Sequence, residues 1–232
     1  MTKKKCSLLI GGMIFPELDQ ADFTGPFEIL SAIPDSKFLT IAKTLQPVHD
    51  KNDLILTPEI TFEEAPQLDV LLIPGGPGVN LLMEDSDTLN FIKKQVSQAK
   101  LIITICTGSL LLGSTGFLKG RHATTHWAAH HLLKLLGAIP EHKRVVQDGN
   151  LISAAGVTSG IDAALLAVAV LCSKETAMEI QLSIEYAPTP PFQSGTPETA
   201  PASVFQKVKN DLALITKERK TIIQRLNLKN LT

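Results

Sequence analysis

The chain has 232 residues, a formal net charge of -1 and 44% hydrophobic residues. That length is enough for one well-packed domain with small additions. The near-neutral charge provides no general electrostatic field for nucleic acid or anionic lipid. Apolar runs such as Leu101–Ile105 are too short to span a bilayer.

The first residues imitate a signal peptide, because three lysines precede an apolar run. That run ends at Pro16 and Glu17 without a small-residue cleavage pattern. We therefore expect a buried first strand. Three cysteines without regular spacing favour neither a disulfide framework nor a zinc ribbon. The expected compartment is the reducing cytoplasm.

Short apolar runs rich in β-branched residues alternate with helical patterns along the chain. This order predicts an α/β fold with a parallel sheet between two layers of helices. The expected strands are Cys6–Met13, Lys37–Ala42, Val70–Ile73, Leu101–Ile105 and Leu151–Ala154. The expected helices are Thr24–Ala32, Leu89–Gln98, Gly108–Thr115, Trp127–Leu136, Gly160–Leu171 and Lys174–Glu185.

The segment Pro188–Pro201 breaks this alternation. Its prolines, mixed with Ser, Thr and Gly, predict an extended loop, and Ala202–Leu228 then follows the pattern of one amphipathic, charged helix. This tail is too small to bury a core of its own. We expect an α/β domain at residues 1–187, and a strap with a helix at 188–232 that packs on that domain or on a second subunit.

The sharpest local feature is a buried β-branched strand that runs directly into Cys106 and a helix. This arrangement is a nucleophile elbow, in which a tight strand-to-helix turn projects one side chain into a crevice at the sheet edge. Gly108 would let the turn close, and the helix N-terminus should lower the pKa of the thiol. A buried structural cysteine is the alternative. We expect that structural role for Cys6 and Cys172.

A second buried strand ends in the glycine-rich turn Pro74–Gly78. Its backbone N–H groups, those of Gly75 and Gly76 among them, are candidates for an oxyanion-hole element. A phosphate loop is excluded because no Gly-Lys-Ser/Thr follows. A turn without any ligand stays open. Because parallel strands end at one edge of a sheet, this turn and Cys106 should lie in the same site.

Asp22 is the candidate proton-transfer partner of Cys106. Thr107, which directly follows the cysteine, cannot serve as a base, whereas Asp22 follows the first strand and immediately precedes a helix. The alternative role for Asp22 is helix N-capping, which Asp favours strongly. Asp19 is a rival that we expect to be solvated.

The histidines at positions 122, 126, 130 and 131 suggest a metal site at first sight. The glutamate of a His-Glu-x-x-His motif is missing, so no metal site is predicted. His126 stands at a strand-to-helix transition. It is therefore predicted to line the active site.

Several segments together resemble the ThiJ/PfpI superfamily: Asp22–Pro26, Pro74–Gly76, Cys106–Ser109, Ala123–Trp127 and Gly156–Asp162. Within that superfamily, Asp22, the pair Cys106-Thr107 and the tail Glu185–Phe192 are most similar to isocyanide hydratases. The resemblance implies a flavodoxin-like three-layer sandwich, a homodimer, a small-molecule substrate, and no metal or organic cofactor.

The implied activity is addition of water to an isocyanide, which gives an N-substituted formamide through a Cys106 thioimidate. Asp22 would transfer the proton, and the N–H groups of Gly76 and Thr107 would stabilise charge. PfpI-type members carry His where this chain has Thr107, and other members use Glu where this chain has Asp22. A glyoxalase or deglycase, a redox-responsive protein and a binding domain without turnover remain alternatives. A DNA-binding regulator of the AraC class is not expected, because Ala202–Thr232 is too short for its helix-turn-helix region.

Overall fold

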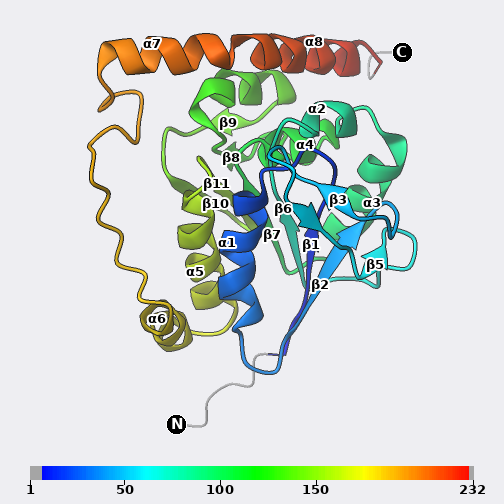
Figure 1. Cartoon of the computed structure of the whole chain (residues 1–232). Helices are drawn as coiled ribbons and strands as arrows, with labels where there is room; N and C mark the ends of the chain where they lie inside the picture. The colour runs from blue at the N-terminus through cyan, green and yellow to red at the C-terminus, as the bar shows by residue number, and fades with distance from the viewer. Residues whose placement is uncertain (1–6, 230–232) are drawn as a thin grey trace.

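The computed structural model describes residues 7–229, and its centre is a seven-stranded sheet (Figure 1). The strand order is β10-β11-β7-β6-β1-β2-β5, and only β10 pairs antiparallel with its neighbour. These strands are β1 Leu9–Met13, β2 Lys37–Ala42, β5 Ile60–Thr61, β6 Val70–Ile73, β7 Leu101–Ile105, β10 Val145–Asp148 and β11 Leu151–Ala154. The prediction of a mainly parallel α/β sheet is confirmed.

Two short ribbons flank this sheet. In one, β3 (Val48–His49) pairs with β4 (Ile55–Leu56), and in the other β8 (His122–Ala123) pairs with β9 (Ile139–Pro140). The helices are α1 Gln20–Ser31, α2 Val79–Leu82, α3 Ser86–Val96, α4 Gly108–Ser114, the 3-10 helix η1 Trp127–Leu136, α5 Ser159–Leu171, α6 Lys174–Ser183, α7 Ala202–Asp211 and α8 Ala213–Lys229.

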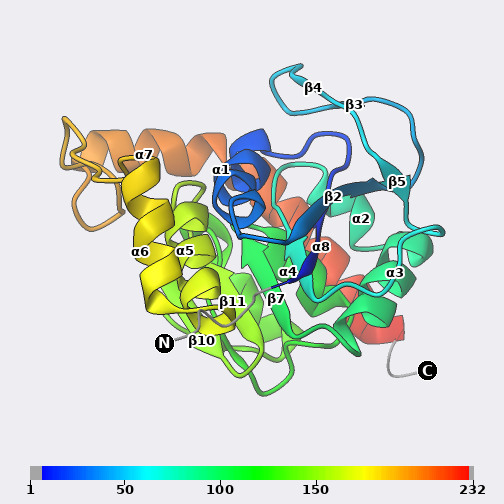
Figure 2. The same cartoon turned by 90° about the horizontal axis from the view of Figure 1, so that it is seen from below.

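Helices cover both faces of the sheet. The crossover from β1 to β2 runs toward the β5 edge, whereas that from β6 to β7 runs toward the β10 edge. Because such crossovers are right-handed, α1 and α3 lie on opposite faces. Helix α5 packs beside α1, as both views show, and α4 contacts α3 (Figures 1 and 2). The result is the three-layer sandwich expected from the family resemblance.

From β1 the chain places β2 and β5 toward one edge of the sheet, and from β6 it places β7 and β11 toward the other edge. The strand order therefore reverses between β1 and β6. In open α/β sheets, such a reversal opens a crevice at the carboxyl ends of the strands, where ligands bind. The parallel register pairs Ile73 of β6 with Thr104 of β7. Gly75 and Cys106 each follow this pair by two residues, so they stand level just beyond the ends of the two strands.

Some boundaries differ from the predictions because capping residues begin helices ahead of their apolar pattern. Helix α1 begins at Gln20, since Asp19 is its N-cap, and α3 begins at Ser86, since Asp85 caps it. Residues 127–136 form a 3-10 helix that ends at Gly137 with a positive φ of 78°. The first strand begins at Leu9. Cys6 lies outside the described residues.

The predicted C-terminal helix is two helices, α7 and α8, that meet at Leu212. Helix α8 packs on η1 and α2, with Ile222 and Ile223 buried. The segment between α6 and α7 runs along one side of the molecule (Figure 1). Near its start, the Tyr186 hydroxyl donates a 2.8 Å hydrogen bond to Asp162 on α5. Within residues 7–229, no helix is long and apolar enough to cross a membrane.

Candidate active site

The elbow after β7 holds Cys106 at a φ of +53°, a left-handed conformation that is strained for a residue with a side chain. Two hydrogen bonds fix this turn. The Cys106 N–H donates to Ala154 O at 3.0 Å, and the Thr125 hydroxyl donates to Cys106 O at 2.6 Å. A side-chain carbon at Gly108 would lie 2.2 Å from Ile73 O. The turn therefore requires glycine at position 108.

Asp22 projects from the first turn of α1 into the protein interior, where it is fully buried. The Gly75 N–H donates a 2.9 Å hydrogen bond to its Oδ2. Burial, and next the negative charge of Asp19, raise the pKa of Asp22 to about 7. Its Oδ1 has no hydrogen-bond partner among residues 7–229. A buried carboxyl in this state can exchange a proton near neutral pH.

Asp19, rather than Asp22, is the N-cap of α1, and its Oδ1 accepts from Ala21 N at 3.3 Å. The expectation that Asp19 is solvated is wrong. Only 8% of the residue is exposed, and its Oδ2 lies 2.5 Å from Lys51 Nζ. Asp19 and Lys51 thus form an ion pair at the edge of the site. Asp22 is free of the capping role.

The Cys106 thiol lies next to Asp22 and is almost fully buried. Burial, and next the charge of Asp22, raise the pKa of Cys106 well above its ordinary value. The Thr107 N–H and the positive charge of Arg219 lower this pKa, but by less. The expected lowering by the helix N-terminus is therefore outweighed. Because each anion disfavours the other, the two acids titrate as a coupled pair that retains a shared proton.

The loop residues Gly75 and Gly76 form hydrogen bonds to both sides of the site, one to Asp22 and the other to Thr107 next to Cys106. The Gly76 N–H donates to Thr107 Oγ1 at 3.0 Å, while the Gly75 N–H is bonded to Asp22. An oxyanion role for either N–H group therefore requires an exchange of partners. A side-chain carbon at Gly76, whose φ is +130°, would lie 2.5 Å from Asp19 N. In this structure the two glycines position the reactive side chains.

His126 is the N-cap of η1, with its Nδ1 accepting from Ala128 N at 3.4 Å. Burial, and next the positive charge of Arg219, lower its pKa to about 4, with smaller effects from Asp19 and Lys51. These are the charged groups that surround Cys106. His126 therefore stands near the site and is neutral at pH 7.

Arg219 is a site residue that the sequence patterns do not reveal. It comes from α8, is only 5% exposed, and donates from Nη2 to Gly76 O at 3.1 Å. Its Nε donates to Asn80 Oδ1 at 2.9 Å. In the sequence, Arg219 is not distinguished from the other charged residues of an amphipathic helix, and no local motif connects it to Cys106.

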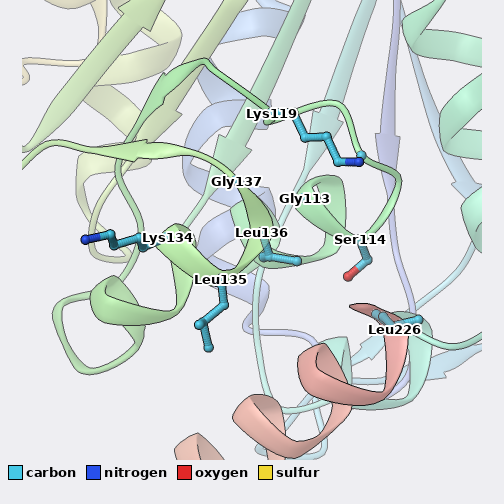
Figure 3. Close-up of a pocket in the computed structure, with 9 residues that line it drawn as sticks. Gly113, Ser114, Lys119, Lys134, Leu135, Leu136, Gly137 and Leu226 are labelled. Atoms are coloured by element: carbon cyan, nitrogen blue, oxygen red, sulfur yellow. The ribbon is translucent and has the colours of Figure 1, made fainter. Parts of the chain in front are cut away.

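Two hollows of the surface lie away from the Asp22–Cys106 pair. One pocket of about 250 Å³ lies where η1, α8 and the end of α4 meet (Figure 3). Its lining residues are Gly113, Ser114, Gly116, Lys119, Lys134, Leu135, Leu136, Gly137 and Leu226. A groove of about 380 Å³ separates α2 from α8. Neither hollow contains a residue of the reactive pair.

Neither His130 nor Cys172 belongs to the reactive pair. The His130 ring stacks on His142 at 3.7 Å, and no cluster of metal-ligating side chains occurs among residues 7–229. Cys106 is the free cysteine of this part of the chain. Cys172, expected to be a structural buried thiol, is disulfide-bonded.

The chain is similar to a known protein family and to individual known proteins. Residues 10–170 match the model of the DJ-1/PfpI family. An isonitrile hydratase of Pseudomonas putida is 48% identical over 219 residues, which are 94% of this chain and 96% of that protein. The protein DJ-1alpha of Drosophila melanogaster is 30% identical over 183 residues, covering 76% of this chain and 83% of its own.

Solved structures extend this relationship to the fold. A THiJ/PfpI family protein from Pseudomonas syringae superposes with a TM-score of 0.91 at 38% identity, covering 94% of this chain and 90% of its own. Drosophila melanogaster DJ-1beta superposes with a TM-score of 0.71 at 24% identity. It covers 78% of this chain and 100% of its own. At that identity, the second likeness concerns the fold alone.

Proposed function

This chain belongs to the DJ-1/PfpI family, and we propose that it is an isocyanide hydratase with Cys106 as its nucleophile. The observation that carries this proposal is the buried pair of Cys106 and Asp22, with the pKa of Asp22 raised to about 7. The 48% identity to an isonitrile hydratase over nearly the full length of both chains supports the substrate class.

An isocyanide carbon accepts a nucleophile and a proton at the same atom. In the resting pair at neutral pH, one proton is shared between the Cys106 sulfur and the Asp22 carboxyl. Transfer of this proton to Asp22 leaves a thiolate beside a carboxylic acid. The thiolate attacks the terminal carbon while Asp22 delivers the proton to that carbon, which forms a covalent thioimidate.

Hydrolysis of the thioimidate returns the pair to its starting state. Asp22, now a carboxylate, takes a proton from water as the water oxygen adds to the thioimidate carbon. Asp22 then gives this proton to the nitrogen. The carbon–sulfur bond breaks, the hydroxyl proton of the intermediate returns to the Cys106–Asp22 pair, and an N-substituted formamide leaves. The overall reaction adds one water to one isocyanide, so no oxidant or reductant is consumed.

The surrounding backbone supports this chemistry by holding each group in place. Gly75 fixes one carboxyl oxygen of Asp22 and leaves Oδ1 for proton exchange. The Thr107 N–H bonds to the Cys106 sulfur and stabilises its anionic form. The N–H groups of Gly76 and Thr107 are the donors proposed for charge near the reacting centre, and the Gly76 N–H must exchange its bond to Thr107 Oγ1 to take this role.

A homodimer is also part of the proposal. Three large apolar side chains of α5 and α6 are exposed in the single chain: Val170 by 49%, Met178 by 62% and Leu182 by 82%. Light scattering of the purified protein at several concentrations tests the assembly. A constant mass of one chain would reject the dimer and leave the chemistry untouched.

The direct test is turnover. Purified protein is mixed with an aryl or alkyl isocyanide, and formamide is followed by chromatography, with methylglyoxal as a parallel substrate. We expect formamide from the isocyanide and none with Cys106→Ala. Consumption of methylglyoxal without formamide would favour the deglycase alternative instead. The absence of both reactions would favour a redox-responsive protein or a binding domain.

A further inference from the structure

Arg219 is an unusual residue for the interior, because it is almost fully buried and forms no direct ion pair in the described part of the chain, although the charge of the neighbouring Glu218 acts on it. Its guanidinium donates to Gly76 O and to Asn80 Oδ1, which are neutral acceptors. Among residues 7–229, no carboxylate oxygen lies within 4.0 Å of its nitrogens. Burying an ion without a contacting counter-ion is costly, and an anion that forms nearby offsets part of that cost.

The contacts of Arg219 place it on the reactive side of the site. Gly76 O, its acceptor, also accepts from the Thr107 hydroxyl at 3.3 Å, and Thr107 directly follows Cys106. The carboxylate of Glu218 accepts from Asn80 Nδ2 at 3.3 Å, which turns Asn80 Oδ1 toward Arg219. Helix α8 and α2 thus fix the guanidinium beside the elbow.

We propose that Arg219 is a positioning residue that supplies the counter-charge for the Cys106 thiolate, delivered to the site by the docking of α8. The two hydrogen bonds from the Arg219 guanidinium to Gly76 O and Asn80 Oδ1 hold its positive charge at the elbow. Both acceptors are neutral, so the guanidinium has no contacting anion among the described residues until the thiolate forms. The inference deepens the proposed hydratase function, on which its catalytic meaning rests.

Other charged groups face the same sulfur. Asp22 and Asp19 approach from α1, Lys51 from the turn between β3 and β4, and the neutral His126 from the start of η1. The two carboxyls oppose thiolate formation, whereas Lys51 is already paired with Asp19. Glu218 acts on Arg219 from the same helix, but its carboxylate is bonded to Asn80. Arg219 is therefore the cation of this set that no carboxylate contacts directly. An Arg219 variant leaves these other groups in place, so a difference from the wild type reports Arg219 once the docking of α8 is controlled.

The test measures the thiolate directly and needs no isocyanide. The rate of Cys106 alkylation by iodoacetamide is followed from pH 6 upward in the full-length wild type, Arg219→Met and Arg219→Lys. With Arg219→Met we expect the midpoint to rise by about one pH unit, so the rate below the midpoint falls about tenfold. Arg219→Lys, which keeps the charge, should retain most of the wild-type rate.

The matched control is Arg225→Met on the same helix. Arg225 pairs with the exposed Glu84. The substitution Arg225→Met removes an equal charge at a position away from the elbow, so the alkylation profile of this variant should equal that of the wild type. Thermal unfolding verifies that each variant is folded. If Arg219→Met does not fold, Arg219→Gln replaces it, with the same expected shift.

An unchanged midpoint in the neutral Arg219 variant would overturn the inference, as would an equal shift with Arg225→Met, because α8 docking rather than charge would then be responsible. Isocyanide turnover by the wild type is assayed separately. A wild type without turnover, but with the expected alkylation shift, would reject only the proposed function. Turnover without the shift would reject only the role of Arg219.

Discussion

The backbone N–H of Gly75 donates a 2.9 Å hydrogen bond to Oδ2 of Asp22, across 53 positions of sequence. This bond joins the loop after β6 to the first turn of α1, so the two strands at the switch point of the sheet share one buried carboxyl. It stabilises the carboxylate, yet burial dominates and the pKa of Asp22 stays near 7. The proton on Asp22 is thereby available at physiological pH.

The pH dependence of kcat/KM follows from this coupled pair. Below about pH 7, Asp22 is protonated and cannot accept the thiol proton of Cys106. At high pH the pair loses its last proton, and none is available for the isocyanide carbon. We expect a bell-shaped profile with its acid limb near pH 7. Formamide production measured from pH 5 to 10 checks this, and a flat profile between pH 6 and 8 would contradict it.

Asp19 should tune the acid limb without taking part in the reaction. Asp19→Asn keeps an N-cap, since Asn caps as well as Asp. It removes the negative charge that helps raise the pKa of Asp22, and it frees the positive charge of Lys51. Both changes lower that pKa, so the acid limb should move to lower pH.

The matched control for Asp19→Asn is Asp85→Asn. Asp85 also caps a helix, α3, and pairs with a lysine, Lys43. It is not among the residues that shift the pKa of Asp22. Its profile should coincide with that of the wild type. An acid limb that moves upward with Asp19→Asn, or equally in both variants, would argue against this account.

Gly75→Ala should disable the site by steric contact. A side-chain carbon there would lie 2.6 Å from Thr107 N and 2.8 Å from Asp22 Oδ2. One of these groups must shift, and displacements of that size cost catalysis about 10²-fold. Gly195→Ala, which meets nothing within 4 Å, is the control. Equal kcat values for the two variants would show that the loop adapts.

The strained elbow makes a prediction about stability. Two inactive variants, Cys106→Ala and Cys106→Gly, both remove the sulfur, but only glycine adopts the +53° φ without strain. Cys106→Gly should therefore be more stable to urea by about 1 kcal/mol, which reverses the usual advantage of Ala over Gly. A more stable Ala variant would mean that the elbow relaxes once the thiol is removed.

The sequence predicts the central sheet well because its parallel strands are buried on both faces. β6, β7 and β11 are fully buried, and each appears as an uninterrupted run of apolar or small residues. The short ribbons, by contrast, have two-residue strands such as β3, which leave no periodic pattern. Strands of that length are defined by tertiary pairing and not by local composition.

The candidate site divides in the same way. Cys106 and Gly75 follow strands that the pattern reveals, so their place at the sheet edge is predictable. The pKa of Cys106 cannot be predicted from the sequence, because burial raises it, the helix N-terminus lowers it, and the sequence does not show which effect is larger. Arg219 is hidden for a different reason. Its role depends on how α8 docks, which no local motif encodes.

Asp22→Asn separates the chemical role of Asp22 from any structural one. Asn is close in size and its oxygen can still accept from Gly75, but it cannot donate or accept a proton. The rate of formamide production should fall by at least about 10²-fold. Asp22→Glu, which keeps the carboxyl but moves it by one methylene, should retain part of the activity. Near wild-type turnover by the Asn variant would reject the acid–base role.

The same variant should change how stability depends on pH. The folded-state pKa of Asp22 is about 7 against an ordinary 3.8, so the contribution of Asp22 to stability is most favourable below pH 3.8 and becomes less favourable as pH rises toward 7. Asp22→Asn removes this loss. Its free energy of unfolding, relative to the wild type, should therefore rise by roughly 3 kcal/mol between pH 4.5 and 8.

The control with the opposite sign is Asp50→Asn. Burial raises the pKa of Asp50, but the N–H groups of Leu54 and Asn52 outweigh it and hold that pKa below its ordinary value. Asp50 therefore stabilises the fold above its ordinary pKa, and its stabilisation is lost at lower pH. Relative to the wild type, Asp50→Asn should become less stable as pH rises. Urea titrations of the three proteins at several pH values check both directions, and parallel curves for all three would contradict the buried, raised state of Asp22.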